Sequence, residues 1–68
     1  MRFSGKKLQQ ARRDSGESQF AFATAMGVST RTQQRYEVGD EVPDADYVAK
    51  AAERTGRALD WFYEAVAA

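Results

Sequence analysis

A chain of 68 residues can form one domain with a small hydrophobic core, and we expect a single domain over residues 1–68. The chain has no cysteine and no histidine, which excludes disulfides and thiolate sites and removes the commonest general base and metal ligand. We therefore expect no enzyme, metal, cofactor or small-molecule ligand. No apolar run can span a membrane and the start lacks the apolar core of a signal peptide, which predicts a cytoplasmic protein.

Charge is distributed unevenly along the chain. Ten Lys and Arg residues balance ten Asp and Glu residues overall. Seven of the basic residues but only two of the acidic ones lie in residues 1–36. Such a molecule can present a positive end to phosphates, although chance asymmetry in a globular domain remains the alternative.

The first predicted helix begins near Ser4, whose hydroxyl can cap it, and ends near Ser15, with Gly16 as its stop. Its apolar stripe is short and consists of Leu8 and Ala11. Three basic residues of this helix are either ordinary surface charges or contacts to DNA phosphates: Lys6, Lys7 and Arg13.

Residues 18–39 predict two short helices joined by a tight turn. Ser18 can cap the first helix, Gly27 suits the left-handed conformation that ends it, and Ser29 can cap the second. The inner face of the first helix consists of Phe22, Ala23 and Met26. So short a turn forces a steep crossing, as in a helix-turn-helix, whose second helix enters the major groove of DNA.

The second of these helices begins with six polar residues, from Thr30 to Arg35. Arg31, Gln34 and Arg35 share one face, and Thr30 lies at the helix start, where recognition helices meet base edges. Arginine binds guanine bidentately and glutamine binds adenine, so these four are candidate base readers, supported by Ser29 at the groove edge. A solvated surface helix is the alternative interpretation.

A loop over residues 38–43 precedes a helix that Asp44 can cap and Gly56 can end. The inner face of this helix consists of Tyr47, Val48, Ala51, Ala52 and Thr55. We expect a last helix from Leu59 to Val66, with aromatic residues that close the core or contact another chain.

Many residues in the right order resemble the Cro and repressor (Xre-like) family of phage and bacterial regulators, most of all small prophage-type repressors. The resemblance covers nearly the whole chain. It is carried by Gly5, Leu8, Ala11-Arg12, Ser18-Gln19, Ala23, Gly27-Val28-Ser29, Tyr36-Glu37, Gly39, Pro43, Ala52, Gly56 and Leu59-Asp60-Trp61. It implies an all-α, compact five-helix bundle of the phage-repressor type, with the helix-turn-helix at helices 2 and 3. It also implies a dimer that binds a double-stranded, palindromic DNA operator and represses transcription.

The resemblance assigns two further roles. Arg12 and Glu37 are expected to pair and tie the first helix to the end of the recognition helix, and Gln19 is expected to contact the DNA backbone. We place the dimer interface at the last helix and the turn before it, around Arg57, Leu59, Trp61 and Phe62.

The chain departs from the family pattern at three places. Gln33 stands where most members have an apolar residue, Phe20 occupies a usually polar outward position, and the loop after the recognition helix is acidic. These departures keep open a second hypothesis, a protein-interaction module or antitoxin-like component with weak DNA binding. The carboxylates of the acidic segment are better explained as turn and cap residues than as a metal site: Asp40, Glu41, Asp44 and Asp46.

Overall fold

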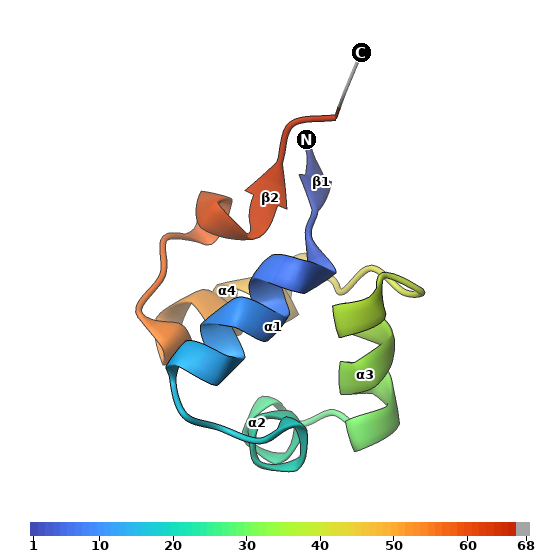
Figure 1. Cartoon of the computed structure of the whole chain (residues 1–68), viewed down its shortest axis with the longest axis vertical. Helices are drawn as coiled ribbons and strands as arrows, with labels where there is room; N and C mark the ends of the chain where they lie inside the picture. The colour runs from blue at the N-terminus through green and yellow to red at the C-terminus, as the bar shows by residue number, and fades with distance from the viewer. Residues whose placement is uncertain (67–68) are drawn as a thin grey trace.

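The computed structural model describes residues 1–66, so the last two residues of the predicted domain, 67 and 68, lie outside it. The described residues form four α-helices, namely α1 (Gly5–Asp14), α2 (Gln19–Met26), α3 (Thr30–Val38) and α4 (Ala45–Thr55). A short strand β1 (Arg2–Phe3) precedes them, and a 3-10 helix η1 (Leu59–Phe62) and a strand β2 (Tyr63–Glu64) follow. The two strands stand side by side at the end of the molecule opposite α2 (Figure 1).

Each α-helix begins at a side-chain cap. The caps are the four residues predicted from the sequence, and each accepts a hydrogen bond from the backbone N–H three residues later: Ser4, Ser18, Ser29 and Asp44. Gly27 ends α2 with φ of 77°, a left-handed conformation that costs glycine little. These local signals confirm the predicted positions of the first four helices, except that Val38, which we expected in the loop, is the last residue of α3.

The core lies where the inner faces of the helices meet. α1 contributes Leu8, α2 contributes Phe22, α4 contributes Val48 and η1 contributes Phe62, and all four side chains are fully buried. Burying a side chain of this size stabilises the fold by about 1.5–3 kcal/mol. The predicted inner faces of α2 and α4 are thus confirmed, although Thr55 at the end of α4 is only partly buried.

The first turn of α1 packs directly on the last turn of α3. A Cβ atom placed on Gly5 would lie 2.6 Å from the carbonyl oxygen of Glu37 and would also meet the carbonyl oxygen of Tyr36. Only glycine allows two backbones to approach this closely. Gly5 therefore fixes how α3 is mounted on the rest of the protein.

The predicted five-helix bundle is wrong. Residues from Leu59 onward form only the four-residue η1, and the chain then becomes extended and pairs with the N-terminal residues. β1 and β2 are antiparallel, with Arg2 opposite Glu64 and Phe3 opposite Tyr63. The fold of the described residues is therefore four α-helices with a small two-stranded sheet.

Contacts between the two ends of the chain explain this difference. The backbone N–H of Ser4 donates to the carbonyl of Phe62 at 2.8 Å. In a continued α-helix, that carbonyl would instead accept a hydrogen bond from within the helix. The rings of Phe3 and Tyr63 meet edge to face at 6.0 Å, and aromatic residues favour strands. None of the helices in residues 1–66 is long and apolar enough to cross a membrane.

Candidate functional site

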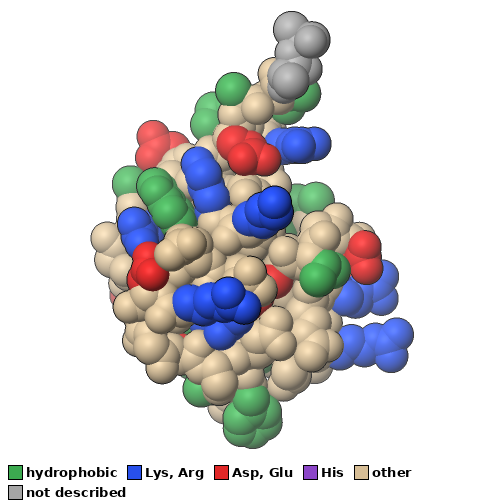
Figure 2. All heavy atoms as spheres, viewed as in Figure 1, with side chains coloured by type: hydrophobic (Ala, Val, Ile, Leu, Met, Phe, Trp, Pro, Cys, Tyr) green, Lys and Arg blue, Asp and Glu red, His purple; other side chains and the backbone are tan. Residues whose placement is uncertain are grey.

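The candidate base readers lie on the outer side of α3. Arg31, Gln34 and Arg35 are exposed, and Thr30 is partly exposed in the first turn of the helix. Lys and Arg side chains project from this side of the molecule and also gather over α1 (Figure 2). The three exposed readers line one shallow, open hollow, together with Gln19 and with Val38 and Asp40 at the end of the helix.

A capped turn presents this helix to solvent. The hydroxyl of Ser29 accepts from the backbone N–H of Thr32 and donates to the Thr32 hydroxyl, both at 3.0 Å. Ser29 therefore fixes the start of α3, next to Thr30. Gly27, in a left-handed conformation, ends α2, and Ser29 caps α3 two residues later. The residues of the turn therefore determine where α3 and its polar outer face begin.

Arg35 already has a partner in the acidic loop. Its Nε lies 3.6 Å from Oε1 of Glu41, and both side chains are about half exposed. An ion pair this exposed contributes at most about 1 kcal/mol and is weakened by salt. A phosphate or a base edge can therefore compete for Arg35, whereas Arg31 forms no ion pair among the described residues.

Arg12 and Glu37 form a bidentate pair between α1 and α3. The guanidinium donates from Nε to Oε2 at 2.8 Å and from Nη2 to Oε1 at 3.1 Å, and both side chains are buried. A third bond, from Nη1 of Arg12 to the backbone carbonyl of Glu17, measures 2.8 Å. A planar guanidinium held in three places fixes the end of α3 against α1.

The carboxylate of Glu37 is also the centre of a larger polar network. It accepts from the side-chain amides of Gln33 at 2.7 Å and Gln19 at 3.0 Å. Burial alone would raise the pKa of Glu37, but the hydrogen bonds from Arg12, Gln33 and Gln19 and the charge of Arg12 outweigh it and lower that pKa. Glu37 is therefore ionised at neutral pH.

Gln33, which departs from the pattern of the family that the sequence resembles, finds its second partner on α4. The hydroxyl of Tyr47 donates to its amide oxygen, and burial raises the pKa of Tyr47, which keeps this hydroxyl protonated. No buried side-chain polar atom in residues 1–66 lacks a partner. The sequence pattern assigned Tyr47 to an apolar face, and its role in this network had no signal in the sequence except the unexplained amide of Gln33.

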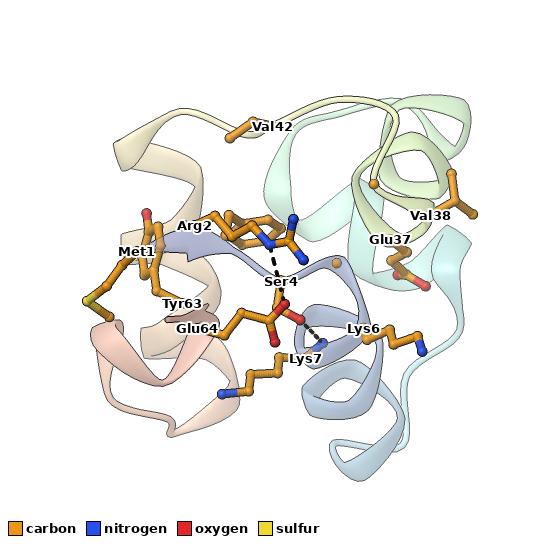
Figure 3. Close-up of a pocket in the computed structure, with 13 residues that line it drawn as sticks. Met1, Arg2, Ser4, Lys6, Lys7, Glu37, Val38, Val42, Tyr63 and Glu64 are labelled. Carbon is orange, nitrogen blue, oxygen red and sulfur yellow. Dashed lines mark hydrogen bonds and ion pairs between the residues drawn. The ribbon is translucent and has the colours of Figure 1, made fainter. Parts of the chain in front are cut away.

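The basic residues of α1 do not form one cluster. Lys6 and Lys7 extend from α1 in opposite directions, Lys6 on the side of Glu37 and Lys7 on the side of Glu64 (Figure 3). The ammonium of Lys7 lies 5.6 Å from the ring centre of Trp61. Arg13 is exposed near the other end of α1. Of the three predicted backbone contacts, Lys6 is the one that lies beside α3.

The predicted dimer residues are also divided. Phe62 is fully buried in the protein's own core, so it has no surface to offer a partner. Leu59 is 52% exposed, and Trp61 is partly buried beneath the guanidinium of Arg57, which lies 4.3 Å from the ring centre. Arg57 is further held by an ion pair with Asp14 at 2.5 Å. Leu59 is therefore the most exposed residue of this set, and Arg57 and Trp61 are partly exposed.

Comparisons with known proteins do not identify a family for this chain. The chain matches no family model, no curated protein and no solved structure.

Proposed function

We propose that this protein is a sequence-specific regulator of transcription that binds double-stranded DNA, a repressor of the Cro and repressor type. One observation carries the proposal: the outer face of α3 is polar, exposed and presented by a capped turn after α2. A major groove admits one α-helix, and α3 offers it side chains that can bind base edges.

Four residues of α3 are the proposed contacts to base edges. Arg31 and Arg35 suit guanine, which offers two acceptors, and Gln34 suits adenine, which offers an acceptor and a donor. Thr30 can contact either kind of base edge. Arg31 is the strongest candidate because it has no intramolecular ion pair in residues 1–66 and lines the hollow on α3.

Phosphate contacts complete the proposed interface. The first turn of α2 presents free backbone N–H groups next to Gln19, which favours an anion there. Lys6 lies beside the end of α3 and can reach a phosphate on the same side, and Lys7 and Arg13 are further candidates. Such contacts fix the position of α3 without reading sequence.

We further propose that the protein acts as a dimer in the cytoplasm, where phage and bacterial DNA lies. A single small domain buries little DNA surface, and two copies on a palindromic operator multiply specificity. Leu59 and the partly exposed Trp61 are the proposed contact between copies.

Selection of sites from a random duplex pool tests the proposal. We expect an enriched palindromic sequence whose binding weakens steeply with salt, because phosphate contacts release counterions. The variant Arg31→Ala should lose preference at one base pair of each half-site, whereas Lys6→Ala should weaken binding to all sequences equally. Failure to enrich any sequence would contradict the proposal.

A protein-interaction module is the second candidate function. The well-exposed large apolar side chains in residues 1–66 include Phe20 at 70%, Val38 at 71% and Val42 at 73%. Val38 and Val42 line a hollow between β1, the start of α1 and the loop after α3. Binding of a protein partner there would depend little on salt, in contrast to binding of DNA.

A further inference from the structure

Arg35 differs from Arg31, the other arginine on the outer face of α3, in having an anionic partner. Its Nε lies 3.6 Å from Oε1 of Glu41 in the acidic loop, whereas Arg31 has no ion pair within residues 1–66. Figure 2 shows acidic as well as basic side chains on this side of the molecule. The two arginines of one helix therefore have different electrostatic surroundings.

The backbone of the loop places Glu41 beside Arg35. The carbonyl oxygen of Arg35 accepts from the backbone N–H of Asp40 at 3.0 Å and from that of Glu41 at 3.4 Å. The chain thus folds back over the end of α3 onto the same residue whose side chain pairs with Glu41. Because these backbone bonds hold the turn, they bring the carboxylate of Glu41 close to the guanidinium of Arg35.

A guanidinium beside a carboxylate keeps its donors but loses most of its attraction for an anion. The nitrogen paired with Glu41 is Nε, which carries a single N–H, and the other donors of Arg35 lie on its two Nη atoms. Guanine offers two neutral acceptors, O6 and N7, which an arginine can bind together. A DNA phosphate is an anion, and the charge of Glu41 repels it. The pair therefore favours a guanine edge over a phosphate as the ligand of Arg35.

We propose that Glu41 is a positioning residue that makes Arg35 a reader of guanine and prevents it from serving as a general phosphate contact. This inference rests on the proposed function, DNA reading by α3. Phosphate contacts supply most of the binding to DNA of any sequence, so the same carboxylate lowers the affinity for random DNA. The acidic loop, which departs from the pattern of the family that the sequence resembles, thereby gains a role in specificity.

Two matched substitutions separate the ion pair from the charge. Glu41→Gln and Asp40→Asn each remove one exposed carboxylate from the loop, but only Glu41 pairs with Arg35 within residues 1–66. Both variants should bind a random duplex about two- to fivefold more tightly at low salt, because one repelling charge is lost. Only Glu41→Gln should lower the preference for guanine at the base pair that Arg35→Ala identifies, by about two- to fivefold. A merely structural role for Glu41 would lower stability and leave the base preference unchanged.

The Arg35→Ala background tests whether Glu41 acts through Arg35. In that background Glu41→Gln should have no further effect on the preference for guanine, because the contact is already lost, although binding to random duplex should still tighten. A second readout needs no DNA. In spectra of the ¹⁵N-labelled protein, the Nε–H resonance of Arg35 should shift in Glu41→Gln and stay in place in Asp40→Asn.

Four results would overturn the inference. They are a base other than guanine at the position read by Arg35, an unchanged guanine preference in Glu41→Gln, an equal loss in Asp40→Asn, and a loss that persists in the Arg35→Ala background. If the wild-type protein selects an operator and Glu41→Gln reads it unchanged, this inference alone fails. If the wild-type protein selects no duplex, the proposed function fails and the role of Glu41 fails with it.

Discussion

The buried ion pair between α1 and α3 leads to a prediction about stability. Arg12→Met keeps most of the aliphatic side chain but removes the guanidinium from the fully buried carboxylate of Glu37. Glu37 then retains only the neutral amides of Gln19 and Gln33. Breaking one side of a buried pair costs about 3–5 kcal/mol. A domain of this length has a total stability of only about 3–10 kcal/mol, so we expect the variant to be marginal or unfolded at pH 7.

The pH dependence of this loss follows from the pKa of Glu37. In the wild-type protein that pKa lies below the ordinary value of 4.5, so the pair stabilises the fold above pH 4.5 and the stabilisation is lost as pH falls through the folded-state pKa. Without Arg12, burial dominates and raises the pKa of Glu37. The variant should then be most stable below pH 4.5 and weaken as pH rises. The difference between the two proteins should therefore be largest near pH 7 and smallest near pH 4.

Urea unfolding between pH 4 and 8 measures this difference, with the single tryptophan, Trp61, as the fluorescent reporter. Arg13→Met is the matched control, because Arg13 is exposed and its loss should change the free energy of unfolding by less than about 0.5 kcal/mol. Combining Arg12→Met with Glu37→Gln removes both charges, leaves an amide oxygen that can accept from Gln33, and should recover most of the stability. A loss below about 1 kcal/mol at pH 7, or one that does not vary with pH, would refute the reasoning.

Three further predictions concern packing and recognition. Gly5→Ala should lower the free energy of unfolding by about 1–3 kcal/mol, since its Cβ meets backbone carbonyls of α3, whereas Lys6→Ala should have little effect in the same urea titration. Phe62→Ala should cost about 3–5 kcal/mol in thermal unfolding, while Leu59→Ala should stay within about 0.5 kcal/mol, and equal losses would contradict the assignment of Phe62 to the core. Arg31→Ala should weaken operator binding by about 1–3 kcal/mol in a gel-shift titration, and unchanged binding would remove Arg31 from the readers.

The helical part of the fold could be predicted because its signals are local. A cap such as Ser29 and a left-handed glycine such as Gly27 act within a few residues of the helix they bound. The inner faces follow from the helical repeat in the same way. These features need no knowledge of what the helix packs against.

The C-terminal segment was predicted wrongly because its structure depends on distant residues. β1 and β2 each have two residues, too few to show an alternating pattern, and they lie at opposite ends of the sequence. The aromatic run from Leu59 suits either a helix or a strand. Contacts with distant residues, such as those of Ser4 with Phe62 and of Phe3 with Tyr63, select the extended form.

The sequence predicted part of the polar network around Glu37, and it missed the partner that comes from a distant helix. The resemblance to a known family suggested the pair of Arg12 and Glu37, and the sequence indicated that Gln33 needs partners. The partner on α4, Tyr47, lies on the face assigned to the core by its periodicity, and a hydrophobic pattern carries no information about where its hydroxyl points. Such partners become visible only when the helices are placed together.

Titration of the ¹⁵N-labelled protein with its selected duplex tests the central claim most directly, since it maps which residues meet DNA. We expect the largest chemical-shift changes in the first two turns of α3 and at the start of α2, with side-chain shifts at Arg31 and Gln34. The chemical shifts of β1, η1 and β2 should change little, because these elements face away from DNA. Changes concentrated on the strands and η1, with α3 unaffected, would contradict the account.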